Sequence, residues 1–273
     1  MTQYSRNTTV DDPEAVPIRD AATVMIVDER PELHVLMVQR TSRAVFGPSA
    51  WVFPGGRVDP DDAVDLDAIV HGLDDAAASK MLEVDASGRA WWFAGLRETL
   101  EEAGLLLGAG DAAVDAIDRT RTAVHADARR FAPALTENGL SLDLSQMYEV
   151  ARFITPLGPP RRFDTRFFVA AAPKNQIASH DEAEVVQHRW VRPAEAIEAW
   201  RSNDFPLMSV THRMLACLGR YGSVDELIGV AATRRDAARV RVNDPDGAYE
   251  VVLPGEPGYE TADVEIEHGW VRI

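Results

Sequence analysis

A single amphipathic helix places the strongest constraint on how this chain folds. Over residues 90–103 the apolar side chains recur at helical spacing and fall on one side of the helix, at about 100° per residue. Glu98, Glu101 and Glu102 fall together on the opposite side, and Gly104 follows at a position where helices commonly end. The fold must therefore bury one face of this helix and present three carboxylates on the other.

Three carboxylates on one helix face repel one another, and each like-charged pair one turn apart costs about 0.2–0.5 kcal/mol. A divalent cation reverses the sign of that interaction, because Mg²⁺ and Mn²⁺ prefer oxygen ligands and share their remaining positions with water and phosphate. The helix therefore indicates a metal site or, if it is taken alone, a solvated acidic surface.

A glycine turn precedes this helix in the sequence. Residues 51–53 predict a short strand that stops at Pro54, Gly55 and Gly56. Paired glycines allow the backbone to approach a ligand closely, so the Gly55 carbonyl is a candidate metal ligand. An ordinary tight turn is the alternative interpretation.

The rest of the chain mixes strands with helices and shows no regular β-α-β alternation. Apolar, β-branched runs predict strands at 21–27, 34–39, 150–155, 166–172 and 185–191, and a hairpin at 238–253. Helical spacing predicts helices at 111–137, 193–200 and 207–219. These elements predict an α/β (α+β) fold in which helices pack on a mixed β-sheet.

Composition suggests how the chain divides. Residues 1–20 are polar, with several Asp and Pro, and predict a flexible N-terminal arm. Residues 21–220 hold the strands and helices of one domain, interrupted at about 60–89 by an acidic, alanine-rich helical insertion. Residues 221–273 form a C-terminal extension that we expect to pack on the core or on the partner in a homodimer.

The charge balance excludes some classes of partner. The chain has 28 Lys plus Arg against 44 Asp plus Glu, a formal net charge of −16. Nucleic acid polymers and anionic membrane surfaces are bound through an excess of basic residues, so neither is an expected partner. The sequence holds no apolar run of about 20 residues that could span a membrane. Cys217 is the only cysteine, which excludes an intrachain disulfide and makes the cytoplasm the predicted compartment.

The glycine turn and the acidic helix together resemble the Nudix box of the Nudix hydrolases, G-x5-E-x7-R-E-U-x-E-E-x-G-U, in which U is apolar. The matching positions are Gly56, Arg97, Glu98, Glu101, Glu102, Gly104 and Leu105. Thr99 departs from the pattern by replacing an apolar residue, and Asp62 stands where an isolated glutamate is expected. The spacer of seven residues becomes the 34 residues from 63 to 96, an excursion that a surface loop tolerates.

The resemblance implies a mixed β-sheet sandwiched between helices, with the helical insertion lying inside the box. It also implies Mg²⁺ or Mn²⁺ as cofactor and hydrolysis of a diphosphate that is joined to another moiety. On this resemblance Glu101 and Glu102 are the first metal ligands, and Glu98 is a further ligand or the group that activates water. Arg97 is expected to hold the carboxylates in place by ion pairing.

Nudix hydrolases often take one more carboxylate from a loop far along the chain. Glu184 lies six residues before Trp190, where the family commonly places this catalytic base or metal ligand. Glu182 is the alternative in the same acidic loop, and the third interpretation is a loop without a chemical role.

Basic and aromatic residues near the box are candidates for binding the substrate. The candidates are Arg40, Phe53, Arg161, Arg162 and Arg166. The last three lie in residues 161–168, the densest basic patch of the chain, and arginine suits bidentate bonding to phosphate. Alternatively, Asp164 pairs with a neighbouring arginine and the patch is structural.

The long insertion makes the region from about residue 20 to 215 similar to the subgroup of peroxisomal coenzyme A diphosphatases. Residues 39–47 resemble the basic run that coenzyme A enzymes carry before the glycine turn, but Val45 and Ser49 occupy the expected arginine and glycine positions. Coenzyme A or a derivative is therefore one expected substrate. Hydrolysis of ADP-ribose or NADH and sanitation of the nucleotide pool are alternatives, as is a sensor of the same fold that binds a nucleotide without cleaving it.

Overall fold

The computed structural model describes residues 12, 14–44, 47–156, 158–181, 184–243, 250–253, 255–262 and 264–273. The strands are β1 Ile18–Glu29, β2 Leu33–Arg40, β3 Trp51–Val52, β4 Gly55–Arg57, β5 Val70–His71, β6 Leu142–Asp143, β7 Met147–Ile154, β8 Arg162–Ala171, β9 Val185–Val191, β10 Ala238–Asn243, β11 Glu250–Val252 and β12 Val264–Val271. The α-helices are α1 Asp75–Leu82, α2 Arg89–Ala103, α3 Val114–Ala126, α4 Phe131–Glu137, α5 Pro193–Arg201, α6 Ser209–Leu218 and α7 Val224–Ala232.

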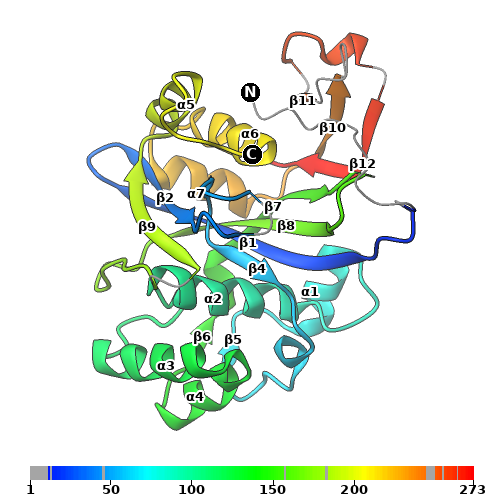
Figure 1. The fold of residues 1–273 in the computed structure, drawn as a ribbon. Helices are drawn as coiled ribbons and strands as arrows, with labels where there is room; N and C mark the ends of the chain where they lie inside the picture. Colours follow the sequence, from blue (N-terminus) through cyan, green and yellow to red (C-terminus); the bar gives the residue numbers. More distant parts are fainter. Residues whose placement is uncertain are drawn as a thin grey trace.

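One large sheet organises the molecule, and its strands run in both directions. Its strand order is β11-β10-β12-β7-β8-β1-β2-β3, while β4 pairs with β1 and β9 pairs with β2 (Figure 1). The long central strand β1 is parallel to β8 and antiparallel to β2 and β4. This arrangement confirms the predicted mixed sheet and, with it, the α+β class.

Helices cover both faces of the sheet, as expected (Figure 1). Alternate residues of β1 point to opposite faces, so Val24 and Ile26 pack into the core that α2 covers. Met25 and Val27 belong to a second core on the other face, which α6 and α7 cover. The apolar stripe of α2 is thus buried on the sheet, which turns the opposite stripe of that helix away from this core.

The predicted insertion contains the short 3-10 helix η1 Pro60–Ala63, strand β5 and helix α1. Strand β5 pairs in parallel with β6, and helices α3 and α4 lie beside this small sheet on the same side of the molecule as α2 (Figure 1). The insertion therefore leaves the glycine turn, passes along α2 and returns at the start of that helix.

The C-terminal segment extends the sheet. Trp270 and Val271 of β12 pair with Arg152 and Ala151 of β7, and β10 pairs with both β12 and β11. The predicted hairpin at 238–253 corresponds to β10 and β11, and residues 244–249 between them lie outside the described residues. Residues 1–11 and 13 of the predicted arm also lie outside them, whereas Ile18 already belongs to β1.

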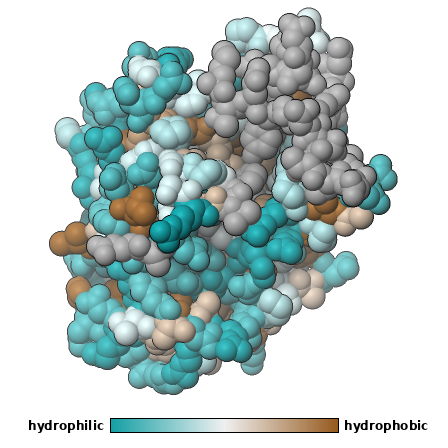
Figure 2. All heavy atoms as spheres, viewed as in Figure 1, coloured by the Kyte–Doolittle hydropathy of each residue, from teal (hydrophilic) through white to brown (hydrophobic). Residues whose placement is uncertain are grey.

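The face of the molecule shown in Figure 2 is mostly hydrophilic, and its hydrophobic residues occur in small separate groups. Within the part of the chain that the structure describes, no helix is both long enough and apolar enough to cross a membrane.

Candidate functional site

Helix α2 carries the carboxylates that the sequence singled out. Glu98 and Glu102 lie one helical turn apart and both line a cavity at the side of the sheet, whereas Glu101 does not line it. The helix ends at Gly104, whose φ of 68° is left-handed and whose N–H donates to the Leu100 carbonyl. The spacing of the motif thus translates into two carboxylates at the cavity and a third beside them.

Arg97 fixes the orientation of this group from within the protein. Its Nε and Nη2 donate to the two carboxylate oxygens of Asp62, each at 2.9 Å, and its Nη1 donates to Glu98 at 2.8 Å and to Glu101 at 3.0 Å. Its Nη2 also donates to the Arg57 carbonyl at 3.0 Å. Arg97 is only 3% exposed, so one buried guanidinium serves three carboxylates.

The glycine turn lies directly against these carboxylates. The backbone N–H of Gly55 donates to Oε2 of Glu102 at 3.0 Å. A β-carbon on Gly56 would lie 2.4 Å from the carboxyl carbon of Glu98, so the Glu98 carboxylate would have to move away from its present position. Glycine at position 56 is therefore required for the turn to approach Glu98 as closely as it does.

Burial and mutual repulsion make these carboxylates hard to ionise. The pKa of Glu98 is raised to about 7, chiefly by burial and also by the nearby charge of Glu101, while Arg97 works in the opposite direction. Burial, and then the charge of Glu98, holds the pKa of Glu102 well above its ordinary value. Burial also raises the pKa of Glu101, although its hydrogen bond to Arg97 works in the opposite direction.

Glu184 approaches the same group from the loop before β9. It lines the cavity, and its negative charge contributes to the raised pKa of Glu98, Glu101 and Glu102. Its backbone is held by Asp181, whose carboxylate accepts from the Glu184 N–H at 3.2 Å, and by Thr41, whose N–H donates to the Glu184 carbonyl at 3.0 Å. The alternative candidate, Glu182, lies outside the described residues.

The donor set suits a hard divalent cation. Glu98, Glu101 and Glu102 supply oxygen ligands, and their negative charges repel one another. The positive charge of Arg97 compensates them only in part, because the same guanidinium also binds Asp62. In the described part of the chain, however, no three His, Cys, Asp or Glu side chains already stand in the positions of metal ligands. The residues fit the ion in the chemistry of their donor atoms.

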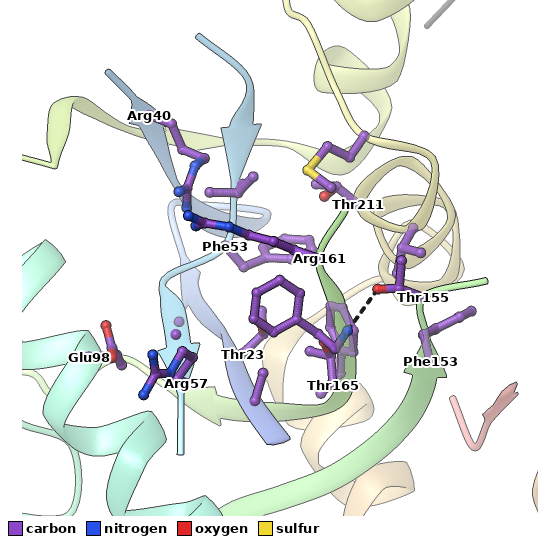
Figure 3. Close-up of a pocket in the computed structure, with 18 of the residues that line it drawn as sticks. Thr23, Arg40, Phe53, Arg57, Glu98, Phe153, Thr155, Arg161, Thr165 and Thr211 are labelled. Carbon is purple, nitrogen blue, oxygen red and sulfur yellow. Dashed lines mark hydrogen bonds between the residues drawn. The ribbon is translucent and has the colours of Figure 1, made fainter. Parts of the chain in front are cut away.

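The cavity has a volume of about 720 Å³ and lies between the sheet and the N-terminal end of α6. Arg40, Phe53 and Arg161, three of the candidates for binding the substrate, line it, and so does Gly55. Figure 3 shows Arg40 and Arg161 reaching toward each other over Phe53. Neither guanidinium makes an ion pair among the residues described, and Nε of Arg40 is buried without a hydrogen-bond partner.

The placement of Arg162 and Arg166 corrects the expectation from sequence, because neither lines the cavity. Both are buried on the opposite face of β8, where Arg166 donates to Glu149 at 2.9 Å and to the Leu82 carbonyl at 2.8 Å. Nε of Arg162 donates to the Thr155 carbonyl at 3.0 Å. Strand alternation explains the outcome, since residues 162, 164 and 166 share one face and only 161, 163, 165 and 167 reach the cavity.

One residue that sequence reasoning missed is Arg121 of α3. Its Nη2 donates to the carbonyls of Glu101, at 3.1 Å, and of Ser179, at 2.8 Å, and its Nη1 donates to Oγ of Ser179 at 2.5 Å. It therefore ties the end of α2 to the loop that leads to Glu184. A β-carbon on Gly104 would lie 2.7 Å from Nη1 of Arg121, so the last glycine of the box also makes room for this contact. Its long-range partners leave no signal in the local sequence.

Comparisons with known proteins agree with this geometry. A family model described as the NUDT19 Nudix domain matches residues 74–210, just over half of the chain. The acyl-coenzyme A diphosphatase NUDT19 of Xenopus laevis is 24% identical over 237 residues, which cover 72% of this chain and 62% of that protein. The protein of the same name from Gallus gallus is 25% identical over 264 residues, covering 77% and 70%.

A third relative is the putative nudix hydrolase 7 of Caenorhabditis elegans, 26% identical over 180 residues that cover 66% of this chain and 53% of that protein. The chain thus spans less than two thirds of the frog and nematode relatives that it matches. Among solved structures, a NUDIX hydrolase from Alicyclobacillus acidocaldarius superposes with a TM-score of 0.67 at 26% identity, covering 79% of this chain and 97% of that one.

Proposed function

This chain belongs to the family of Nudix hydrolases represented by the NUDT19 Nudix domain, and from that membership we propose that it is a metal-dependent diphosphatase. The proposed substrate is a nucleoside diphosphate joined to another moiety, with coenzyme A or an acyl-coenzyme A as the first choice. The name acyl-coenzyme A diphosphatase belongs to the frog and chicken relatives, and its extension to this chain is part of the proposal.

The observation that carries the proposal is the distribution of charge around one cavity. Glu98, Glu102 and Glu184 line it, and so do Arg40 and Arg161, whose guanidiniums form no ion pair with any residue that the structure describes. The negative charge of a diphosphate is stabilised in two ways, by cations that the carboxylates hold and by hydrogen bonds from arginine. On a solvated acidic surface the carboxylates would be exposed to water, whereas those of Glu98 and Glu102 are buried.

Each residue of the site has a proposed role that follows from its position. Glu98, Glu101 and Glu102 would hold Mg²⁺ or Mn²⁺, with the Gly55 carbonyl as a further donor. When bound, the cation supplies neutralisation of the diphosphate and lowers the pKa of a water molecule for attack on phosphorus. Glu184 is exposed at the cavity and would accept the proton of that water. Arg97, already bonded to Glu98 and Glu101, keeps these two carboxylates in register.

The alternatives within the same chemistry are hydrolysis of ADP-ribose or NADH and sanitation of the nucleotide pool, and the alternative of another class is a nucleotide sensor. ADP-ribose and NADH carry the same diphosphate, and Ser49 stands where coenzyme A enzymes are expected to carry glycine. A sensor that binds without cleaving would have no need for the three glutamates of the box, and all three are present here.

The deciding experiment is product analysis with coenzyme A, octanoyl-coenzyme A, ADP-ribose and NADH, each with Mg²⁺ and with Mn²⁺. We expect cleavage of coenzyme A or its acyl derivative to 3′,5′-ADP and the corresponding 4′-phosphopantetheine. Glu102→Gln should abolish turnover, and the matched control Glu137→Gln, on the exposed side of α4, should leave it intact. Full turnover by Glu102→Gln would refute the mechanism, and binding without turnover by the wild type would favour the sensor.

We propose the cytoplasm as the compartment, because the single cysteine, Cys217, is buried and unpaired. The homodimer stays a prediction, which sedimentation of the purified protein can test. Binding of nucleic acid polymers is not expected at this net charge.

A further inference from the structure

One end of the cavity differs in chemistry from the end that holds the carboxylates. In Figure 3, Glu98 and Arg57 lie on one side, and Phe153, Thr155 and Thr211 lie on the other. Uncharged residues of the cavity lining adjoin these three in sequence, pair with them across the sheet, or belong to β8 and to β11, which contacts α6, whereas the guanidinium of Arg161 reaches toward Arg40 (Figure 3). Together with Phe153, Thr155 and Thr211 they are Ile154, Pro156, Phe163, Thr165, Phe167, Met208, Ser209, Val210 and Val251.

Strand β8 gives this end a regular pattern of rings and hydroxyls. Phe163, Thr165 and Phe167 are alternate residues of one strand, so all three point to the same face of the sheet. The hydroxyls of Thr165, Ser209 and Thr211 make no hydrogen bond to any described residue. Polar groups without partners beside aromatic rings indicate a ligand that is apolar along its length and carries a few hydrogen-bonding groups.

The other wall of this end comes from two segments that lie far apart in the sequence. The N-terminal turn of α6 supplies Met208 and Val210, and Trp51 fixes that turn by donating its N–H to the Pro206 carbonyl at 2.8 Å. Strand β11 contacts α6 and supplies Val251. Val251 lies beyond residue 210, where the match to the family model ends. The C-terminal extension therefore completes the wall.

We propose that this uncharged end binds the pantetheine arm of coenzyme A, with the C-terminal extension as part of its wall. The inference rests on the proposed function and deepens it. The arm is an uncharged aliphatic chain with two amide groups, which match apolar side chains and free hydroxyls. The 3′-phosphoadenosine half of the same molecule carries a further phosphate, which is better matched to the part of the cavity where the guanidiniums of Arg40 and Arg161 approach each other (Figure 3).

Binding of the two product halves tests this assignment without requiring turnover. Isothermal titration with 4′-phosphopantetheine and, separately, with 3′,5′-ADP, both with Mg²⁺, compares the wild type with Val210→Trp. Since the indole would fill the uncharged end, we expect affinity for 4′-phosphopantetheine to fall about tenfold or more, and affinity for 3′,5′-ADP to change less than about twofold. Val114→Trp is the matched control, because Val114 begins α3 and is 55% exposed.

A second variant guards against a folding defect. Thr165→Val keeps the shape of the side chain and removes its hydroxyl, so affinity for 4′-phosphopantetheine should fall about two- to tenfold with an unchanged melting temperature.

Three results would overturn the proposal. They are absence of 4′-phosphopantetheine binding by the wild type, unchanged affinity in both variants, and an equal loss for 3′,5′-ADP. If the wild type binds 4′-phosphopantetheine as expected but cleaves no diphosphate, the arm site stands and the proposed hydrolysis fails.

Discussion

The guanidinium of Arg97 binds both carboxylate oxygens of Asp62, and both side chains are almost completely buried. Asp62 lies at the start of the insertion and Arg97 belongs to the helix that follows it, so this ion pair joins the two ends of the inserted segment. Asp62 also accepts the Asp59 N–H at 2.8 Å. The residue that stands in place of the isolated glutamate of the box thus orients the arginine of the same box.

Asp62→Asn should lower the free energy of unfolding by about 3 kcal/mol, because it leaves a buried guanidinium with one charged partner fewer. Urea unfolding followed by circular dichroism measures the change. The control is Glu137→Gln, which breaks an exposed pair with Arg130 and should cost less than about 1 kcal/mol. Equal costs for the two variants would show that the buried pair is not special.

Gly56→Ala should abolish most of the activity, because its β-carbon would meet the Glu98 carboxylate at 2.4 Å and displace it. Gly229→Ala is the matched control, since no atom lies within 4 Å of a β-carbon at that position in α7, and alanine should stabilise the helix by about 0.5–1 kcal/mol. Steady-state rates and melting temperatures of both variants check the pair. Retained activity in Gly56→Ala would argue against a role for the turn.

The main parts of the site were predictable because they depend on local periodicity. Helical spacing alone places Glu98, Glu101 and Glu102 on one side of α2, and the two glycines mark the end of the strand before them. The same reasoning applied to β8 would have placed Arg162 and Arg166 away from the cavity. Counting the basic residues of this segment without regard to the two-residue repeat of a strand produced the wrong expectation.

Glu102→Gln should stabilise the metal-free protein, and the gain should increase as the pH rises above the ordinary carboxyl pKa. Burial raises the pKa of Glu102 in the folded state, so the stability that its protonated form provides is present below the ordinary carboxyl pKa and is lost as the pH rises through the raised pKa. Glutamine keeps the neutral form at every pH. Differential scanning calorimetry with EDTA and with excess Mg²⁺ tests this, and Mg²⁺ should raise the melting temperature of the wild type far more than that of the variant.

Arg121→Ala should reduce kcat about tenfold with little change in KM, because it releases the loop before Glu184 from the end of α2 and costs three hydrogen bonds. Hydrogen exchange of residues 176–181 should become faster. Arg119→Ala, at an exposed position of the same helix, provides the control. If kcat falls equally in both variants, or exchange in this loop is unchanged, Arg121 does not position Glu184.

Contacts between distant segments could not be derived from the sequence. Arg121 contacts Ser179, and Val251 lines the cavity, only because tertiary packing brings distant segments together. Neither residue belongs to a local sequence motif. Helix α7 was missed although Ser223 caps it and Val224, Leu227 and Ala231 form its buried face, because it is only nine residues long and follows directly on another helix. The extension beyond residue 221 gained a structural interpretation only from the pairing of β12 with β7.

His212 should make the protein less stable as the pH falls from about 6.5 to 4. Burial, followed by the charges of Arg213 and Arg201, lowers the pKa of His212 to about 4, and its ring packs on Trp200 with centroids 4.1 Å apart. The unfolded chain binds a proton near pH 6.5, so the stability present above that pH is lost on acidification. Allowing for partial solvent screening, His212→Gln should reduce this loss by about 1–2 kcal/mol.

Urea unfolding of the wild type and of His212→Gln at pH 7.5, 5.5 and 4.5 isolates this contribution, because other titrating groups are common to both proteins. Parallel curves of stability against pH for the two proteins would contradict the assignment.

The parallel pairing of β1 with β8 sets an order for biosynthesis. Ile18 pairs with Arg162, so the strand on which α2 packs receives its neighbour only after more than half of the chain has been made. A nascent chain on the ribosome that already contains the glycine turn and all three glutamates of α2 still lacks β8 and Glu184. Its acidic helix has no completed sheet to pack against, and contacts of such long sequence separation form slowly. The central pair of parallel strands can therefore form only once Arg162–Ala171 has been added to the chain.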